Sequence, residues 1–122
     1  MRKSALIPSL AAVLAVTSLA AGCGPADRGE RVWLRKCAAC HGKDGRGKTK
    51  FASTRPYADL TDGVWRHGGD LNSIRRVVAD GGDPKSPMPV FRGELSEEDI
   101  DAVAHYVERL ASSPRETTPK NR

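Results

Sequence analysis

Apolar residues recur every three or four positions in three stretches of the chain, and this spacing predicts three α-helices. The clearest helix follows Ser96, which is the expected N-cap, and it ends at Ser112-Ser113-Pro114. Three acidic residues directly after Ser96 suit the positive end of a helix dipole. The apolar positions of this helix are Ile100, Val103, Ala104, Val107, Leu110 and Ala111.

A second helix is predicted over about residues 71–80. Asp70 is its expected N-cap, and Gly81 is the residue at which it should end. A single-turn helix is predicted to begin at Thr61. It would bring the total to four helices.

The remaining helix is predicted over residues 29–39, because Gly29, Trp33, Cys37 and Cys40 are spaced along one helical face. No pair of strands is indicated anywhere in the chain. We therefore predict an all-α fold with three to four helices.

The N-terminus has the pattern of an export signal. Two basic residues precede an apolar run, and the segment 1–22 is too short and wrongly flanked for a transmembrane helix. Its end, Leu19-Ala20-Ala21-Gly22-Cys23, resembles a bacterial lipobox, which predicts that Cys23 becomes a lipidated first residue. The alternative is ordinary cleavage after Ala20 or Gly22, which would leave Cys23 as a free thiol.

The chain after the signal leaves little material for a core. Of the 100 residues from Cys23 onward, 33 are apolar. Such small scaffolds normally need disulfides, a metal or a cofactor, and a large enzyme, a multi-domain protein or a polytopic membrane protein is excluded. We predict an anchor and linker at 23–28, one folded domain at 29–111 and a disordered polar tail at 112–122.

The segment Cys37-Ala38-Ala39-Cys40-His41 carries the chemistry. The spacing C-x-x-C-H is the attachment signature of haem c. Residues i and i+3 of a helical turn face the same way, so Cys37 and Cys40 can both reach the vinyl groups of one porphyrin. The next residue, His41, is then placed to donate an imidazole nitrogen to the iron.

Three other kinds of site use cysteines in similar patterns, and each fits this segment less well. A thioredoxin-like redox pair should follow a strand, and no strand is indicated before Cys37. A zinc site needs a fourth ligand, and the adjacent Cys40 and His41 suit one tetrahedral ion poorly. A plain disulfide leaves His41 without a role.

The region 29–111 resembles a class I cytochrome c. In that family the first helix has a glycine, an aromatic residue and the first haem cysteine at the spacing of Gly29, Trp33 and Cys37, and the last helix crosses at an aromatic residue that Tyr106 matches. The segment 40–47 is similar to the C-H-G-x-D-G-x-G of bacterial members. The segment 60–69 looks like the haem c domains of bacterial haem–copper oxidase subunits.

This resemblance implies one covalent haem c with a methionine as its second axial ligand. Met88 fits, since it lies in a loop between Pro87 and Pro89 before the last helix. The other candidates for the second axial ligand are His67, in a glycine-rich turn, and His105, on the polar face of its helix. We expect His105 to be exposed and His67 to have a role other than ligation.

The family also uses a backbone carbonyl to accept a hydrogen bond from Nδ1 of the proximal histidine. Ala58 is at the matching position here, and Pro56 lies two residues early. Trp65 is expected either to contact the haem or one of its propionates, or to be an ordinary core residue.

Charge is distributed unevenly along the chain. The net charge of +5 becomes +3 when two basic residues leave with the signal. Nine Lys and Arg residues between positions 28 and 55 stand against two acids, and six acids lie between 94 and 108. This pattern predicts either steering of an acidic redox partner or an ordinary solvated surface. Binding to nucleic acid is not expected, because the basic residues do not alternate with aromatic ones.

Together these features predict a monohaem electron-transfer protein on the periplasmic side, anchored to a membrane through Cys23. It would have no small-molecule substrate and no catalytic activity of its own. Two alternatives stay open. The chain could work only as a haem-bearing subunit of a larger oxidase or dehydrogenase, or the iron could be open and serve an enzyme or a sensor.

Overall fold

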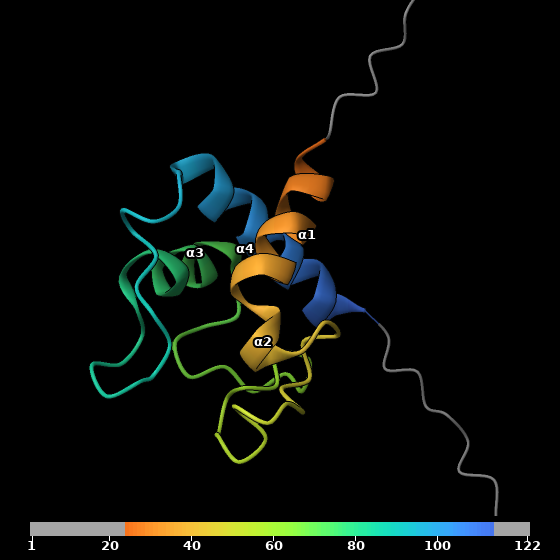
Figure 1. The fold of residues 1–122 in the computed structure, drawn as a ribbon, viewed down its shortest axis with the longest axis vertical. Helices are drawn as coiled ribbons and strands as arrows, with labels where there is room; N and C mark the ends of the chain where they lie inside the picture. Colours follow the sequence, from red (N-terminus) through yellow and green to blue (C-terminus); the bar gives the residue numbers. More distant parts are fainter. Residues whose placement is uncertain (1–23, 114–122) are drawn as a thin grey trace, which may run out of the picture.

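The computed structural model describes residues 24–113, and its regular elements are helices. They are α1 (Pro25–Lys36), α2 (Ala38–His41), α3 (Leu71–Asp80) and α4 (Glu97–Ser112) (Figure 1). Within these residues the only β-type pairing is an isolated bridge between Arg92 and Leu95. The all-α prediction is confirmed. None of the helices described is long and apolar enough to cross a membrane.

Helices α3 and α4 have the bounds that the apolar spacing predicts, and their N-caps are those expected. The side chain of Asp70 accepts a hydrogen bond from the backbone N–H of Ser73 at 3.0 Å. The hydroxyl of Ser96 accepts one from the N–H of Asp99 at 3.1 Å. Each cap satisfies a donor that the first helical turn leaves unpaired.

The N-terminal helical region differs from the single helix predicted over 29–39. Helix α1 begins earlier, at Pro25, where a proline costs no helical hydrogen bond. It ends before Cys37, whose N–H donates to the Trp33 carbonyl at 2.9 Å. Cys37 has a φ of −117° and separates α1 from the short helix α2.

The single-turn helix predicted at Thr61 is wrong. Two aspartates form local turns in this segment, because Asp59 Oδ1 accepts from the Thr61 N–H and Asp62 Oδ1 accepts from the Val64 N–H, each at 2.8 Å. Aspartate side chains that bind backbone two residues onward compete with helix formation.

The core lies between α1, α3 and α4, and it includes the point where α1 crosses α4 (Figure 1). A Cβ atom on Gly29 would lie 2.3 Å from the carbonyl oxygen of Ala102 and 3.0 Å from Cβ of Tyr106, so only glycine permits this approach. The rings of Trp33 and Tyr106 are 5.8 Å apart beside the crossing. These contacts confirm the helix crossing that the family resemblance implied. The largest fully buried side chains are Trp33, Ile100, Val32 and Val103.

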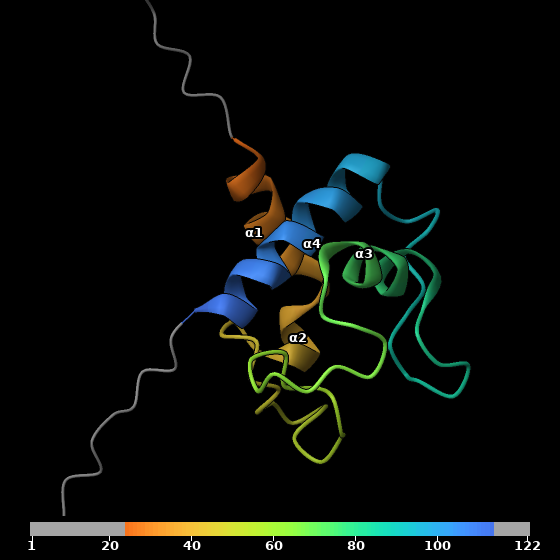
Figure 2. The same cartoon turned by 180° about the vertical axis from the view of Figure 1, so that it is seen from behind.

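Of the two long loops, 42–70 lies mainly at the end of the molecule where α2 is, whereas 81–96 runs beside α3 and leads to the start of α4 (Figure 2). The second loop returns along the end of α3. The N–H of Phe91 donates to the Val78 carbonyl at 3.1 Å, and the N–H of Arg92 donates to the Ala79 carbonyl at 2.9 Å.

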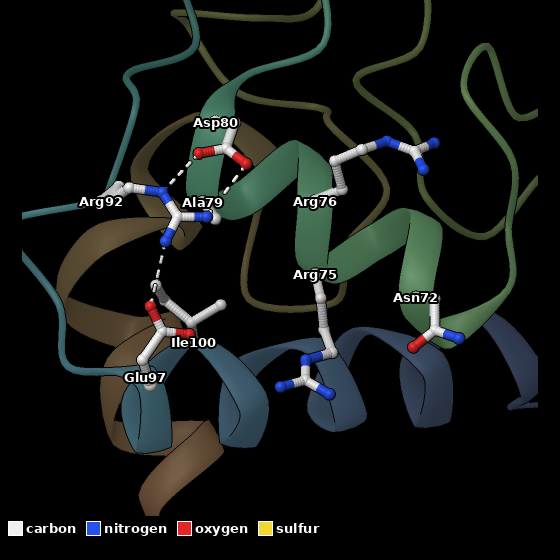
Figure 3. Close-up of a pocket in the computed structure, with 8 residues that line it drawn as sticks. All are labelled: Asn72, Arg75, Arg76, Ala79, Asp80, Arg92, Glu97 and Ile100. Atoms are coloured by element: carbon white, nitrogen blue, oxygen red, sulfur yellow. Dashed lines mark hydrogen bonds and ion pairs between the residues drawn. The ribbon is translucent and has the colours of Figure 1, made fainter.

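Arg92 also fastens this loop through its side chain (Figure 3). Its guanidinium binds both carboxylate oxygens of Asp80, at the end of α3, and donates to Glu97 Oε1 at 3.1 Å, at the start of α4. Beside this bridge is a surface hollow of about 250 Å³. Polar and charged side chains make most of its lining, which consists of Asn72, Arg75, Arg76, Ala79, Asp80, Arg92, Glu97 and Ile100.

Candidate functional site

The C-x-x-C-H segment forms one tight turn around Cys37. The N–H groups of Cys40 and His41 both donate to the Cys37 carbonyl, at 3.2 and 3.0 Å. Cys37 is partly buried and Cys40 is exposed, and both are free thiols. The turn therefore presents two thiols one helical turn apart, with the imidazole directly after them.

The imidazole of His41 is oriented by a backbone carbonyl. Its Nδ1 atom lies 2.9 Å from the carbonyl oxygen of Ala58. Because a carbonyl can only accept, Nδ1 carries the proton and Nε2 keeps its lone pair for a metal. The prediction that Ala58 supplies this carbonyl is confirmed.

Gly47 ties the two partners of that bond together. Its N–H donates to the carbonyl of His41 at 2.7 Å, and a Cβ atom on Gly47 would lie 2.7 Å from the carbonyl carbon of Ala58. Gly47 also has a φ of +67°, which other residues rarely adopt. In the sequence Gly47 is recognisable only as the last residue of the C-H-G-x-D-G-x-G segment 40–47. Its role depends on a contact eleven positions away, which no local pattern shows.

The residue before Ala58 has an unusual backbone as well. Tyr57 has a φ of 65° and is the one non-glycine residue between 24 and 113 with a positive φ. A left-handed conformation at a bulky residue costs energy and is most often found at functional positions. Here it directly precedes the carbonyl that binds His41.

The pKa of Cys37 does not suit a redox pair. Burial, and to a smaller extent the neighbouring Cys40, raises the pKa of the Cys37 thiol to about 11. Reactive cysteines in thioredoxin-like motifs instead have pKa values lowered to about 3.5–7.5. Cys37 is therefore a protonated thiol at neutral pH, not a poised thiolate.

Trp33 lies against this site from the core side. Its ring centroid is 5.9 Å from that of His41, and its side chain is almost fully buried. The indole N–H has no hydrogen-bond partner among the described residues. An orphaned donor beside two free thiols and a free imidazole nitrogen fits a site built to hold a further group.

Met88 lies in the other long loop, 81–96. Its side chain is partly buried and packs against the buried core cluster, as Cys37 does. The N–H of Met88 donates to the hydroxyl of Ser86 at 3.2 Å. The donor set of two thiols, one imidazole and one thioether fits a covalently bound haem c.

The two rival histidines have other surroundings. His105 is exposed on α4, with its ring nitrogens 3.8 Å from Asp101 and 3.7 Å from Glu108. His67 is partly buried, and its imidazole lies against Gly82, where a Cβ atom would be 2.6 Å from Cδ2 of the ring. The expectation that His105 is exposed is confirmed.

Trp65 is packed against the core cluster and against Gly69, where a Cβ atom would approach its indole ring to 2.6 Å. The structure thus gives it a packing role. Cys23 and the export signal lie outside the described residues.

The uneven charge of the sequence is partly neutralised in the fold. Helices α1 and α4 are in contact, so Arg28 pairs with Asp99 at 3.8 Å. Lys36, at the end of α1, pairs with Glu94 in the loop before α4 at 3.5 Å. Some basic residues in the region 28–55 are exposed and have no carboxylate within 4.0 Å among the residues described. They are Arg31, Arg35, Lys43, Lys48, Lys50 and Arg55.

Comparison with known proteins gives one matching family. The model of "Cytochrome C oxidase, cbb3-type, subunit III" matches residues 24–107. Subunit CcoP of the cbb3-type oxidase of Rubrivivax gelatinosus is 35% identical over 86 residues, which are 70% of this chain and 26% of the relative. CcoP of Rhodobacter capsulatus is 33% identical over 103 residues, 80% of this chain and 33% of the relative. The chain thus spans between a quarter and a third of these relatives.

Two solved structures are similar in fold. Cytochrome c6 from the diatom Phaeodactylum tricornutum superimposes with a TM-score of 0.57 at 34% identity, covering 72% of this chain and 95% of the other. The KustC0563 c-type cytochrome superimposes with a TM-score of 0.55 at 24% identity, covering 67% of this chain and 95% of the other. The second similarity supports the fold alone.

Proposed function

Because this chain belongs to the cytochrome c oxidase, cbb3-type, subunit III family and has covalent haem c as its cofactor, we propose that it transfers single electrons between redox proteins on the periplasmic side of a bacterium. The observation that carries this proposal is the turn of Cys37, Cys40 and His41, with His41 fixed by the Ala58 carbonyl. Haem c supplies a one-electron iron couple.

Each residue of the site has a distinct task in this proposal. Cys37 and Cys40 would hold the porphyrin through thioether bonds, His41 would bind the iron through Nε2, and Met88 would bind it through its sulfur. A thioether ligand raises the reduction potential relative to a second histidine. Two protein ligands leave the iron no open position, so the chain carries electrons and has no substrate of its own.

The three cysteines allow an internally controlled test. The full chain, produced with a haem-attachment system, should show covalent haem on a denaturing gel and the added mass of one haem. Cys37→Ala and Cys40→Ala should each lose one thioether bond, whereas Cys23→Ala should keep both. A colourless wild-type protein would contradict the proposal.

A second candidate is a subunit that works only within a larger complex. The relatives are named as subunits of cbb3-type oxidases, which supports this alternative. Purification of the chain from membranes solubilised in detergent distinguishes the two. A complex-bound subunit should co-purify with further redox subunits in a fixed ratio, whereas an independent carrier should not.

The partner that we propose has an acidic docking face. Six exposed basic residues in the region 28–55, which contains the haem-binding turn, have no acidic partner among the described residues. Attraction between the basic residues of this chain and the acidic face of the partner would speed their association and orient the two proteins. The rate of electron transfer should fall with rising salt, and Lys43→Glu should reduce that dependence. Arg75→Leu, which changes a base already paired with Asp101, is the control.

We also propose that the chain is anchored to a membrane by a lipid on Cys23. The support is the sequence pattern before Cys23 and the odd number of cysteines, since the other two are assigned to haem. Cys23→Ala should move the protein into the soluble fraction. Continued sedimentation of this variant with membranes would exclude the lipid anchor.

A further inference from the structure

The loop that carries Met88 is braced by the two residues that follow Trp65. Arg66 Nη2 lies 3.0 Å from Asp83 Oδ2 in a salt bridge. The imidazole of the next residue, His67, lies directly on Gly82, where no side chain would fit. These contacts hold the beginning of the loop against a segment that is distant in sequence.

Asp83 is linked to Met88 by hydrogen bonds within the loop. Its carbonyl accepts from the N–H of Ser86 and its Oδ1 accepts from the N–H of Lys85, each at 2.9 Å. The hydroxyl of Ser86 then accepts from the N–H of Met88 at 3.2 Å. A continuous series of contacts therefore runs from Arg66 to the backbone of the proposed axial ligand.

Arg66 also contacts Tyr57, in the segment whose Ala58 carbonyl orients His41. Its guanidinium lies 5.5 Å from the centroid of the Tyr57 ring, within the range of a cation–π contact. Tyr57 holds its left-handed backbone directly before Ala58, whose carbonyl orients His41. One side chain thus contacts both the loop that positions His41 and the loop that carries Met88.

From this geometry we propose that Arg66 is a positioning residue that joins the two loops and controls how often Met88 leaves the iron. It acts through Asp83 and Tyr57. The proposal rests on the function proposed above, because it requires Met88 to be an axial ligand. Arg66 is about half exposed and the Asp83 side chain is a quarter exposed. We therefore expect the salt bridge between them to have a modest, salt-dependent effect on how often Met88 detaches.

Exogenous imidazole is the probe, because it can bind the ferric iron only when Met88 has left. Its apparent affinity therefore rises in proportion to the fraction of molecules with Met88 detached. Arg66→Leu and Asp83→Asn, measured as haem-loaded full-length protein, should each bind imidazole about two to five times more tightly than the wild type. High salt should bring the wild type closer to Asp83→Asn.

Arg75→Leu is the matched control, because it removes another exposed arginine from a salt bridge of 3.3 Å, with Asp101. It should leave imidazole affinity unchanged even where it lowers resistance to urea as much as Arg66→Leu does. A double-mutant cycle adds a second test. Tyr57→Leu and Asp83→Asn should not be additive, since both act through Arg66.

The outcomes separate this proposal from the proposed function. If Arg66→Leu and Asp83→Asn load haem and bind imidazole as the wild type does, the brace is wrong and the function stands. If Arg66→Leu fails to fold, the isosteric Asp83→Asn decides alone. If the wild type carries no covalent haem, or if imidazole binds it without displacing a thioether, the function itself is contradicted.

Discussion

The Nδ1 atom of His41 donates a hydrogen bond to the carbonyl oxygen of Ala58, seventeen residues further along the chain, across 2.9 Å. This bond fixes the tautomer and the plane of the imidazole, and Nε2 remains for the iron. Because the acceptor is a backbone atom, its position depends on the loop. Gly47 contacts both His41 and Ala58, so a substitution at Gly47 tests how the loop holds this carbonyl.

We predict that Gly47→Ala weakens this bond and the whole fold. The new Cβ would lie 2.7 Å from the Ala58 carbonyl carbon, and alanine would also have to adopt a φ of +67°. The combined loss should be about 2–5 kcal/mol in the free energy of unfolding. Urea unfolding of the haem-loaded protein measures it, and the Nδ1 proton resonance of His41 reports the bond.

Gly63→Ala separates the clash from the backbone cost. Gly63 has a φ of +79° and no atom within 4 Å of the position that a Cβ would take. This variant should lose only about 1–2 kcal/mol and keep the His41 resonance. Equal losses in the two variants would show that contact with Ala58 is unimportant.

Local signals in the sequence predicted much of the fold and the chemical part of the site. Caps such as Asp70 and Ser96 act within three residues, so the bounds of α3 and α4 could be predicted. The break at Cys37 could not, because the apolar face continues through it. At Thr61 the helical pattern was outweighed by aspartate turns.

The contacts that orient the ligands are long-range and left little trace in the sequence. The role of Ala58 followed from the family resemblance and not from periodicity. Nothing local marks Tyr57 as left-handed or Arg66 as the partner of Asp83. The separate basic and acidic stretches also concealed ion pairs such as Arg28 with Asp99, which form only when α1 packs on α4.

The crossing of α1 and α4 gives a second prediction. Gly29→Ala should lower the free energy of unfolding by about 1–3 kcal/mol, because its Cβ would lie 2.3 Å from the Ala102 carbonyl oxygen. The higher helix propensity of alanine, about 1 kcal/mol, would be outweighed. Urea unfolding measures the change. The control is Glu30→Ala at the exposed neighbouring position, which should change stability by less than about 0.5 kcal/mol. A Gly29→Ala variant as stable as this control would refute the close crossing of α1 and α4.

The assignment of Met88 gives a third prediction. Met88→Ala should open the iron, so that the reduced protein binds carbon monoxide rapidly while the wild type does not. Met88→His should keep two protein ligands and exclude carbon monoxide, but lower the reduction potential, since imidazole favours the ferric state more than a thioether does. Optical spectra and a redox titration measure both effects. Rapid carbon monoxide binding by the wild type would favour the open-site enzyme or sensor instead.

The bridge that fastens the loop after α3 should make stability depend on pH. Hydrogen bonds from the Arg92 guanidinium hold the pKa of the Asp80 carboxyl below its ordinary value. A group with a lowered folded pKa contributes fully above its unfolded pKa, about 3.9, and loses that contribution as the pH falls through the folded pKa. Asp80→Asn should therefore be less stable than the wild type in urea at neutral pH, and the two should converge as the pH falls below about 3.9 and through the lowered pKa of Asp80. In an Arg92→Leu background, the difference in stability between Asp80 and Asn at position 80 should no longer change with pH, because the carboxylate then has no guanidinium to lower its pKa. A constant difference between Asp80→Asn and the wild type from neutral to acidic pH would show that the charge of Asp80 does not stabilise the loop.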